Sequence, residues 1–431
     1  MYLYDLFQEY PQITTDSRNC IPGSIFFALK GENFNANAFA AGALEKGCQY
    51  AVVDEPQYAI NEKYILVDDV LKTLQDLATY HRKTLGTKII GITGSNGKTT
   101  SKELIAAVLK EKYKIHFTKG NLNNHIGVPL TLLQLKSEHQ LAIVEMGANH
   151  PGEIKLLSEI TQPDFGIITN VGKAHLEGFG SFEGVKKTKA ELYDFIATDG
   201  LGIFINTDNE HLVGMASKSG IKEEKQIPFS LKNHPDISMV TGKITKNDPL
   251  LGMECQTGST FQVNTNLIGA YNAENILAAV TIGHFFGLSN ALIKKGIESY
   301  IPQNNRSQLT ITERNKLIVD AYNANPTSMQ AAILNFSSME AENKLLILGD
   351  MLELGEESKS EHQKIILLLE ENGFKDVFLV GKEFKQTIHA FKHFDQTEAL
   401  NEYLTTRNFC NLHILIKGSR GISLEKTIPF L

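Results

Sequence analysis

The chain has 431 residues, of which 42% are hydrophobic and 21% charged, and its formal net charge is −7. This length exceeds one ordinary hydrophobic core and favours about two to four domains of a soluble globular protein. The acidic balance argues against nucleic acid as the main partner, because a phosphate backbone needs a basic face. No segment has the apolar length of a membrane-spanning helix, and the four scattered cysteines form no zinc-binding pattern. We therefore expect a cytoplasmic protein without stable membrane insertion.

Residues 1–83 predict a small α/β domain. Short apolar strands are expected at 24–29 and 50–54, and a helix from Asp69 to about Lys83 closes the unit.

Residues 84–302 open with the motif that says most about function. An apolar strand, Lys88-Ile89-Ile90, runs into a glycine-rich loop at 91–100 and then into a segment with helical spacing. In such a loop, backbone N–H groups and a helix N-terminus face a phosphate, a lysine adds charge and a hydroxyl can hold magnesium. The loop departs from the standard phosphate loop because Ile92 stands where the first glycine belongs, and a plain glycine turn beside a surface lysine is the alternative. We predict ATP binding by Gly94, Ser95, Asn96, Gly97, Lys98, Thr99 and Thr100.

Strands alternate with helices through the rest of this domain, which predicts a mostly parallel sheet buried on both faces. Strands are expected at 141–146, 165–170 and 202–206 and a helix at 273–286, while 217–262 reads only as minor strands.

Three sets of polar residues in this domain are candidates for chemistry. Glu145 ends an apolar strand and is a natural oxygen ligand for ATP-bound magnesium. His175 follows another strand and could reach a second metal, although a single histidine is more often a surface or core residue. Asn272 and Asn275 share one helix face and could read an adenine edge, or Asn272 could cap the helix.

Residues 303–431 predict a second doubly wound sheet, after a hinge near 301–305. Asp320, Asp350 and Lys417 stand at strand C-termini, where open α/β sheets place ligands. Arg306 could reach a phosphate in the neighbouring domain, and the basic loop 417–420 suits a carboxylate or phosphate, although exposed loop arginines often do nothing.

Together these motifs resemble the Mur ligase family of ATP-dependent amide-bond-forming enzymes of peptidoglycan synthesis, over essentially the whole chain. The widely shared motifs lie at 94–100, 145–148, 170–178 and 272–275. The resemblance implies an α/β fold of three domains. A small N-terminal domain binds the UDP-sugar substrate, a central ATPase-like parallel-sheet domain binds ATP, and a C-terminal Rossmann-like domain closes on ATP and binds an incoming dipeptide.

Further motifs at 120–129, 149–154, 320–326 and 348–355 resemble the members of the family that join D-alanyl-D-alanine to UDP-N-acetylmuramoyl-tripeptide. The reaction implied runs through an acyl phosphate and gives ADP and phosphate, with ATP and magnesium required and a monomer expected. Competing readings are another Mur-type ligase adding a single amino acid, a folylpolyglutamate synthase-like ligase, a plain ATPase or small-molecule kinase, and a non-catalytic nucleotide-sugar binding protein.

The resemblance also assigns catalytic and metal-binding roles. Lys98 would hold the β- and γ-phosphates, Thr99 and Glu145 the first magnesium, and His175 with a carbamylated Lys189 the second. The family's usual Lys-Gly-Glu is Lys189-Ala190-Glu191 in this chain.

For substrates, the resemblance implies that Arg306 and Asp320 contact ATP after closure, with Arg306 among the catalytic residues. Asn272 and Asn275 would contact adenine, beside Tyr271 where the family usually has histidine. The predicted contacts to the nucleotide sugar and dipeptide are Ser17, Arg18, Lys30, Asn123, Asn124, His125, Tyr322, Asn323, Asp350 and Lys417.

Overall fold

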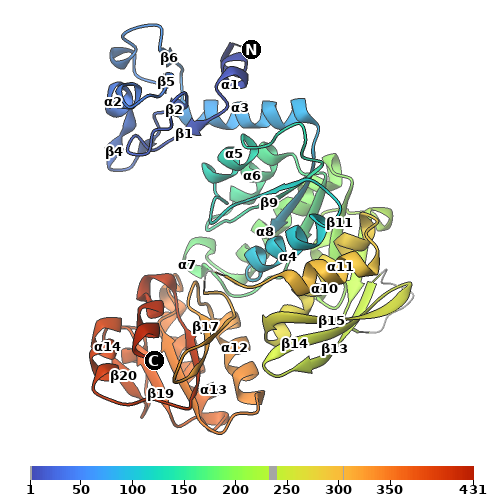
Figure 1. Cartoon of the computed structure of the whole chain (residues 1–431), viewed down its shortest axis with the longest axis vertical. Helices are drawn as coiled ribbons and strands as arrows, with labels where there is room; N and C mark the ends of the chain where they lie inside the picture. The colour runs from blue at the N-terminus through green and yellow to red at the C-terminus, as the bar shows by residue number, and fades with distance from the viewer. Residues whose placement is uncertain (1, 233–239, 304) are drawn as a thin grey trace.

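A computed structural model describes residues 2–232, 240–303 and 305–431. The chain forms three α/β parts in sequence order, seen in Figure 1 as blue, then green to yellow, then orange to red. The predicted α/β class is confirmed. The expected hinge at 301–305 includes Asn304, which lies outside the described residues.

The N-terminal part is built on a four-stranded parallel sheet in the order β1-β2-β5-β6. Its predicted strands are confirmed as β2 and β5. The elements are α1 (Tyr2–Glu9), β1 (Ile13–Thr14), β2 (Ile25–Phe27), β3 (Lys30–Gly31), β4 (Phe34–Asn35), α2 (Ala40–Glu45), β5 (Tyr50–Val53) and β6 (Tyr64–Leu66).

A long helix, α3 (Val70–Leu85), joins this part to the centre of the molecule. The carboxylate of Asp69 caps its start by accepting from the backbone N–H of Lys72, and Gly86, with a φ of 66°, ends it in the left-handed conformation. The buried Arg82 near its end donates to Asp164 at 2.7 Å, which fixes the helix to the central part.

The central sheet has nine strands in the order β15-β14-β13-β12-β11-β10-β7-β9-β8. Pairing is parallel from β8 to β13, as predicted. The strands are β7 (Lys88–Thr93), β8 (Ile115–Phe117), β9 (Leu141–Glu145), β10 (Phe165–Ile168), β11 (Gly202–Asn206), β12 (Gln226–Ser230), β13 (Val240–Asn247), β14 (Leu250–Thr257) and β15 (Ser259–Ile268).

The last two pairings of this sheet are antiparallel, in the region where only minor strands were expected. Asp248 and Pro249 alone separate β13 from β14, and Gly258 alone separates β14 from β15. A parallel return needs a crossover of a dozen or more residues, so connections this short allow only hairpins.

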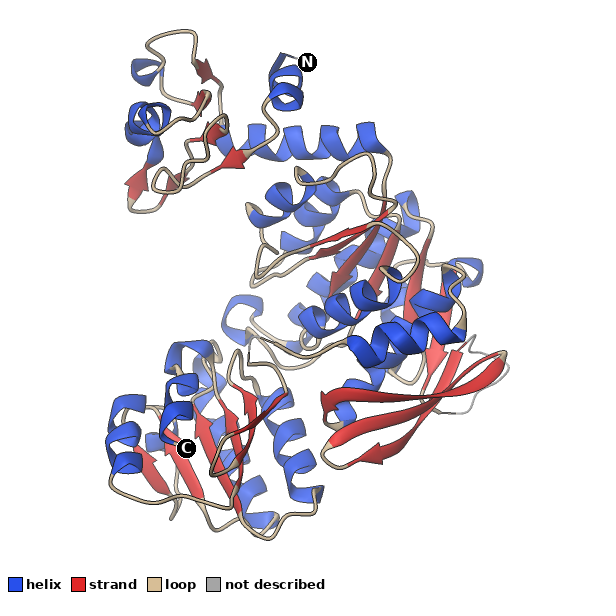
Figure 2. Ribbon diagram, in the orientation of Figure 1, coloured by secondary structure: helices blue, strands red, loops and turns tan. Residues whose placement is uncertain are grey.

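Helices cover both faces of the central sheet (Figure 2). Successive side chains of β7 point to opposite faces of the sheet. Ile90 and Ile92 pack in a core with α4, α10 and α11, and Ile89 packs in the core on the opposite face. The helices are α4 (Lys98–Leu109), α10 (Ala273–Phe285) and α11 (Asn290–Ser299) on one side, and α5 (Gly127–Leu132), α6 (Glu153–Thr161), α7 (Leu176–Phe179), α8 (Phe182–Asp199) and α9 (Glu210–Lys218) elsewhere in this part.

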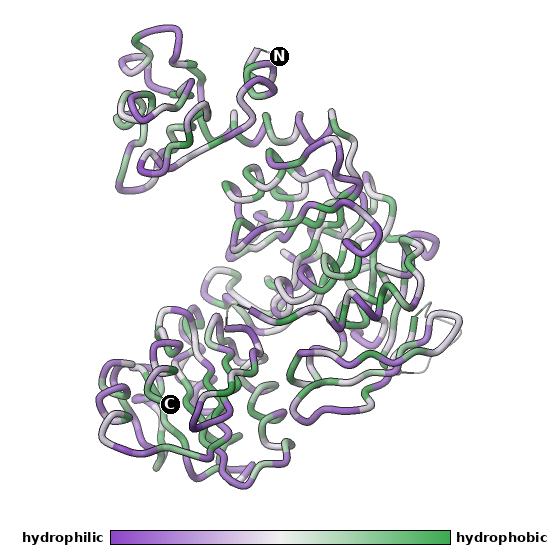
Figure 3. Tube along the Cα trace, viewed as in Figure 1, coloured by the Kyte–Doolittle hydropathy of each residue, from purple (hydrophilic) through white to green (hydrophobic). Residues whose placement is uncertain are grey.

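The C-terminal part holds a six-stranded sheet in the order β16-β17-β21-β18-β19-β20, parallel except at β16. Figure 3 shows the hydrophobic residues along its inner strands and the hydrophilic ones on the surrounding loops. The elements are β16 (Gln308–Ile311), β17 (Lys316–Asp320), α12 (Pro326–Ser338), β18 (Lys344–Gly349), α13 (Ser358–Glu371), β19 (Val377–Val380), β20 (Lys392–Phe394), α14 (Thr397–Thr405) and β21 (His413–Lys417).

Within the described ranges, every helix is too short or too polar to cross a lipid bilayer.

Candidate functional site

One cavity of about 840 Å³ lies between the central and C-terminal parts. The loops that follow β7, β9 and β10 form its central-domain wall, the start of α10 forms one end, and the loop after β17 and the last residue of β21 face them from the C-terminal part. These are the carboxyl ends of parallel strands in two sheets, the edge where α/β proteins bind ligands.

The glycine-rich loop joins β7 to α4 as predicted, and glycine is required at two of its positions. Gly94 has a φ of 146°, and a Cβ there would lie 2.0 Å from the Thr169 hydroxyl. Gly97 has a φ of 77° and stands at the N-cap of α4. The loop is held from behind by β10, since the Thr169 hydroxyl donates to the carbonyl of Asn96 at 2.6 Å. The first residues of α4 line the cavity, and the first N–H groups of a helix have no acceptor within it, as an anion site requires.

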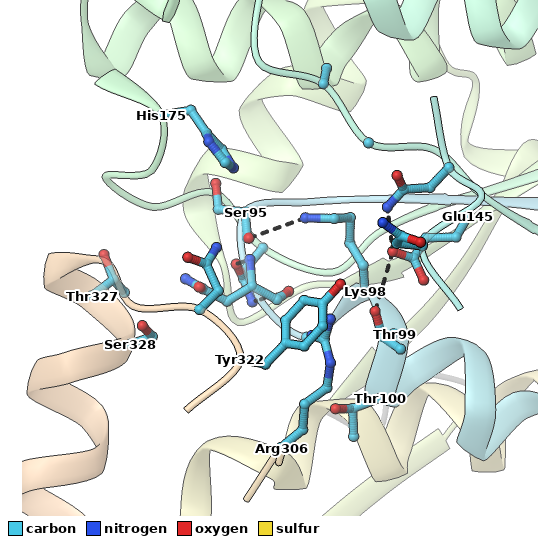
Figure 4. A pocket seen from close by; sticks show the side chains of 18 of the residues that line it. Ser95, Lys98, Thr99, Thr100, Glu145, His175, Arg306, Tyr322, Thr327 and Ser328 are labelled. Atoms are coloured by element: carbon cyan, nitrogen blue, oxygen red, sulfur yellow. Dashed lines mark hydrogen bonds between the residues drawn. The ribbon is translucent and has the colours of Figure 1, made fainter. Parts of the chain in front are cut away.

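Lys98 lies over this loop. Its ammonium donates to the carbonyl oxygens of Gly94 at 2.6 Å and Ser95 at 3.2 Å (Figure 4). Loss of water around the amine lowers its pKa to about 8, with Glu145 favouring and Arg306 opposing the charged form. The amine is thus positioned at the loop and is short of compensating negative charge.

Glu145 and Thr99 meet in the floor of the cavity. The Thr99 hydroxyl donates to Glu145 Oε1 at 3.2 Å, and the Asn123 amide donates to the same oxygen at 2.9 Å (Figure 4). Glu145 Oε2 is buried without a hydrogen-bond partner in the described structure and lies 3.4 Å from the ammonium of Lys102.

This arrangement fits magnesium. Within the ranges described, no group of three or more His, Cys, Asp or Glu side chains is arranged to hold a metal ion by itself. Magnesium at a phosphate site, however, uses only one or two carboxylates together with phosphate oxygens and water. The Thr99 hydroxyl, beside a carboxylate with one oxygen that accepts no hydrogen bond, provides such a pair of ligands.

His175 and Lys189 both lie near the ring of Phe179. His175 lines the cavity at the start of α7, with its ring 6.2 Å from that of Phe179 (Figure 4). Lys189, on α8, is 1% exposed and its ammonium lies 5.2 Å from the Phe179 ring, so it stands behind the cavity wall. Burial, and next the charge of Lys98, lower the pKa of Lys189 to about 7. Near pH 7 a large fraction of the Lys189 side chains is therefore neutral, and a neutral amine is nucleophilic.

The two asparagines of α10 bond to each other, with Asn275 donating to Asn272 Oδ1 at 2.9 Å. Asn272 occupies the N-cap position, but its side chain makes no cap hydrogen bond and donates instead to the carbonyl of Ile268. The capping explanation for Asn272 is therefore wrong. Both amides line the cavity, next to Tyr271, whose hydroxyl bonds to Ser307 at 2.9 Å.

The C-terminal part contributes a stacked and ion-paired group. The guanidinium of Arg306 lies 3.7 Å from the centre of the Tyr322 ring, and its Nε is buried without a hydrogen-bond partner among the described residues. Asp320 accepts from Lys417 at 2.5 Å across adjacent strands. Arg306, Asp320, Tyr322, Asn323 and Lys417 all line the cavity.

The remaining predicted substrate contacts divide by location. Asn123, Asn124 and His125 line the cavity, while Ser17, Arg18 and Lys30 belong to the N-terminal part and do not. Arg18 is paired with Asp16, and Lys30 with Asp54 and Glu55 at 2.9 and 3.0 Å.

Asp350 also lies away from the cavity. It is buried and accepts from the backbone N–H groups of Glu383 and Phe384. The geometry gives it a role inside the C-terminal part, and its predicted substrate contact stays a prediction without geometric support.

Three residues of the site were not predicted. Asn170 accepts from the backbone N–H of Asn96 at 2.9 Å, and its position just after β10 would have marked it. Lys102 faces Glu145 one turn beyond Lys98 on α4, a spacing that the helix period provides. Glu353 pairs with His175 from the C-terminal part, and no sequence signal links two residues 178 positions apart.

Two family models match the chain. The family model described as the Mur ligase middle domain matches residues 92–283, and the one described as Mur ligase, glutamate ligase domain matches 305–420.

Similarity extends over nearly the full chain. UDP-N-acetylmuramoyl-tripeptide–D-alanyl-D-alanine ligase of Bacillus subtilis is 35% identical, across 97% of this chain and 92% of its own. Among solved structures, MurF from Acinetobacter baumannii superposes with a TM-score of 0.87 at 31% identity, covering 97% of this chain and 92% of its own. MurF ligase from Thermotoga maritima in complex with ADP superposes with a TM-score of 0.86 at 25% identity, covering 99% and 97%.

Proposed function

The chain belongs to the Mur ligase family, and on that premise we propose that it joins D-alanyl-D-alanine to UDP-N-acetylmuramoyl-tripeptide at the expense of ATP. The reaction gives ADP and phosphate in peptidoglycan precursor synthesis. We propose that the protein acts in the cytoplasm as a monomer.

The observation that carries this proposal is the convergence of two domains on one cavity. The phosphate loop, Glu145 and His175 enter from the central part, and Arg306, Asp320 and Lys417 enter from the C-terminal part. A plain ATPase needs only the first set. The solved relative from Thermotoga maritima is in complex with ADP, which supports nucleotide binding by this chain.

The chemistry follows from the electrostatics of the site. A carboxylate expels no leaving group, so the tripeptide carboxylate first attacks the γ-phosphorus of ATP, which forms an acyl phosphate and releases ADP. The dipeptide amine then attacks the carbonyl carbon, an amide bond forms, and the C–O bond to phosphate breaks. The first step brings two anions together, and Lys98, Arg306 and the N–H groups at the start of α4 would compensate their charge.

Residue roles follow the same reasoning. Thr99 with Glu145 would hold one magnesium, and His175 with a carbamylated Lys189 another, which supplies positive charge to the phosphoryl group. The depressed pKa of Lys189 favours carbamylation, because only the neutral amine attacks CO₂, with loss of a proton. Asn272, Asn275 and Tyr271 would surround adenine, and Asn123 to His125 would face the muropeptide.

An acceptor panel tests the proposal. Purified protein is given ATP, magnesium and UDP-N-acetylmuramoyl-tripeptide with D-alanyl-D-alanine or with single amino acids, and the product is weighed by mass spectrometry. We expect a product only with the dipeptide. A product only with a single amino acid would assign the chain to another ligase of the family, and ADP release that needs no acceptor would indicate an ATPase.

Labelled oxygen tests the intermediate. When the tripeptide carboxylate carries ¹⁸O, one labelled atom should appear in the released phosphate. Lys98→Met should abolish both product and label transfer, whereas Lys110→Met, at the exposed end of the same helix, should preserve them. Unlabelled phosphate in an active reaction would exclude the acyl phosphate.

A further inference from the structure

A carboxylate from the C-terminal part reaches the imidazole of His175. Glu353, in the loop between β18 and α13, pairs with His175 Nδ1 across the domain boundary. The same loop lies on α7, since the Glu353 carbonyl accepts from the backbone N–H of Glu177 and a Cβ on Gly355 would lie 3.5 Å from Glu177.

The loop that carries Glu353 is anchored within its own domain on both sides. The backbone N–H of Met351 donates to the buried His362 at 3.0 Å, and that of Leu352 donates to the Ser419 hydroxyl at 3.0 Å. Leu354 is 2% exposed in the core. The backbone on both sides of Glu353 is therefore fixed to the C-terminal part.

The conformation of Glu353 is costly for the contact it makes. Its φ is 65°, a left-handed value that costs about 1–2 kcal/mol for a residue with a Cβ. Its side chain is 53% exposed, and an ion pair this open to solvent contributes about 0–1 kcal/mol to stability. Stability alone does not account for a strained residue that makes so weak a pair, and such strain gathers at functional sites.

The atoms involved suggest what the contact does. A carboxylate at Nδ1 keeps the proton on that nitrogen and leaves the lone pair on Nε2, on a ring that lines the cavity (Figure 4). Metal-binding histidines commonly have such a partner, which fixes the tautomer and the ring orientation and increases basicity.

We infer that Glu353 is a positioning residue that orients His175 for a divalent cation. The C-terminal part would thus support the metal site without itself supplying a metal ligand. The inference rests on the proposed function, in which His175 is a metal ligand. It makes the second metal site depend on the arrangement of two domains: cation affinity at His175 is highest when the C-terminal part lies as it does here.

A neighbouring contact provides a matched control. Glu361, also in the C-terminal part, accepts from Lys173 at 2.8 Å across the same boundary and does not touch His175. Glu361→Gln removes this interdomain ion pair but leaves the imidazole contact. A contact that only holds the domains together would make Glu353 and Glu361 equivalent.

The test measures Mn²⁺ binding by electron paramagnetic resonance, with ADP present, in the full-length protein. We expect two bound ions in the wild type and one in His175→Ala. Glu353→Ala should weaken the second ion by about 10–100-fold. Glu353→Gln, which keeps an acceptor oxygen, should recover most of the affinity, and Glu361→Gln should bind as the wild type does.

A second readout follows the imidazole itself. In protein labelled with ¹⁵N-histidine, His175 should carry its proton on Nδ1 in the wild type and Glu361→Gln, and populate both tautomers in Glu353→Ala. Each outcome is decisive. If His175→Ala keeps both ions, the metal role in the proposed function fails. If His175→Ala loses one but Glu353→Ala does not, or if Glu361→Gln matches Glu353→Ala, only the positioning role of Glu353 fails.

Discussion

Acidification should remove the carbamate from Lys189 over a narrow pH range. The pKa of this buried amine is about 7, against an ordinary value of 10.5. At pH 7 the side chain is therefore about half neutral, whereas an ordinary lysine is neutral in only about one molecule in 3000. At pH 6 the neutral fraction of Lys189 falls to about one in eleven. A protonated amine has no lone pair for CO₂, and each carbamate that forms releases a proton, so acidification lowers both the available amine and the yield of the modification.

The assay is ¹³C NMR of the protein under ¹³CO₂, with the dissolved CO₂ concentration held constant. We expect one carbamate signal that loses at least about four-fifths of its intensity between pH 7 and pH 6, following the neutral fraction. Lys189→Met should lack the signal. Lys187→Met, altered at an exposed position on the same helix, should keep it. A signal of equal intensity at both pH values, or one that survives in Lys189→Met, would refute this account.

Two substitutions in α4 and its cap test the phosphate loop and the floor of the cavity. Gly97→Ala and Gly220→Ala both place a Cβ at a left-handed φ, 77° and 72°, and each should cost about 1–2 kcal/mol in urea unfolding. Only at Gly97 would that Cβ also meet the Asn275 oxygen, at 2.7 Å. Calorimetry should therefore show ADP affinity reduced more than about tenfold in Gly97→Ala and unchanged in Gly220→Ala. Equal ADP affinities in the two variants would show that the contact with Asn275 does not affect nucleotide binding. Lys102→Met leaves the buried Glu145 without its cation, and the free energy of unfolding should fall by about 3–5 kcal/mol, whereas a loss below about 1 kcal/mol would show that the carboxylate does not depend on this charge.

The local sequence was sufficient to predict site residues that are positioned by a single turn or by the end of one strand. The phosphate loop was recognised because Gly97, Lys98 and Thr99 are consecutive and follow an apolar strand. Glu145 was found because parallel strands end at one edge of a sheet, and the same rule would have selected Asn170. Both cases depend on a few adjacent residues and on one regular element.

Contacts between distant segments could not be predicted. The alternating pattern of β13 to β15 indicated strands, but their antiparallel pairing depends on connections of one or two residues that had not been recognised. The environment of Lys102 depends on Glu145, and that of His175 on Glu353, partners on other elements. Asp350 stands at a strand end like Asp320, yet its carboxylate turns inward to backbone donors, a choice that the strand pattern does not encode.

In the proposed function, the length of helix α3 contributes to how far the donor substrate must reach. The sixteen residues of this helix extend about 24 Å and connect the N-terminal part to the strand that leads into the phosphate loop (Figure 1). None of the described residues of the N-terminal sheet lines the cavity. In the proposed function, one donor molecule must hold the first domain with its uridine end and present its terminal carboxylate near Lys98. A donor one amino acid shorter would fall about 3.5 Å short of that point. The distance between the first domain and Lys98 would then select donors by the number of amino acids in their peptide, whatever the last side chain is.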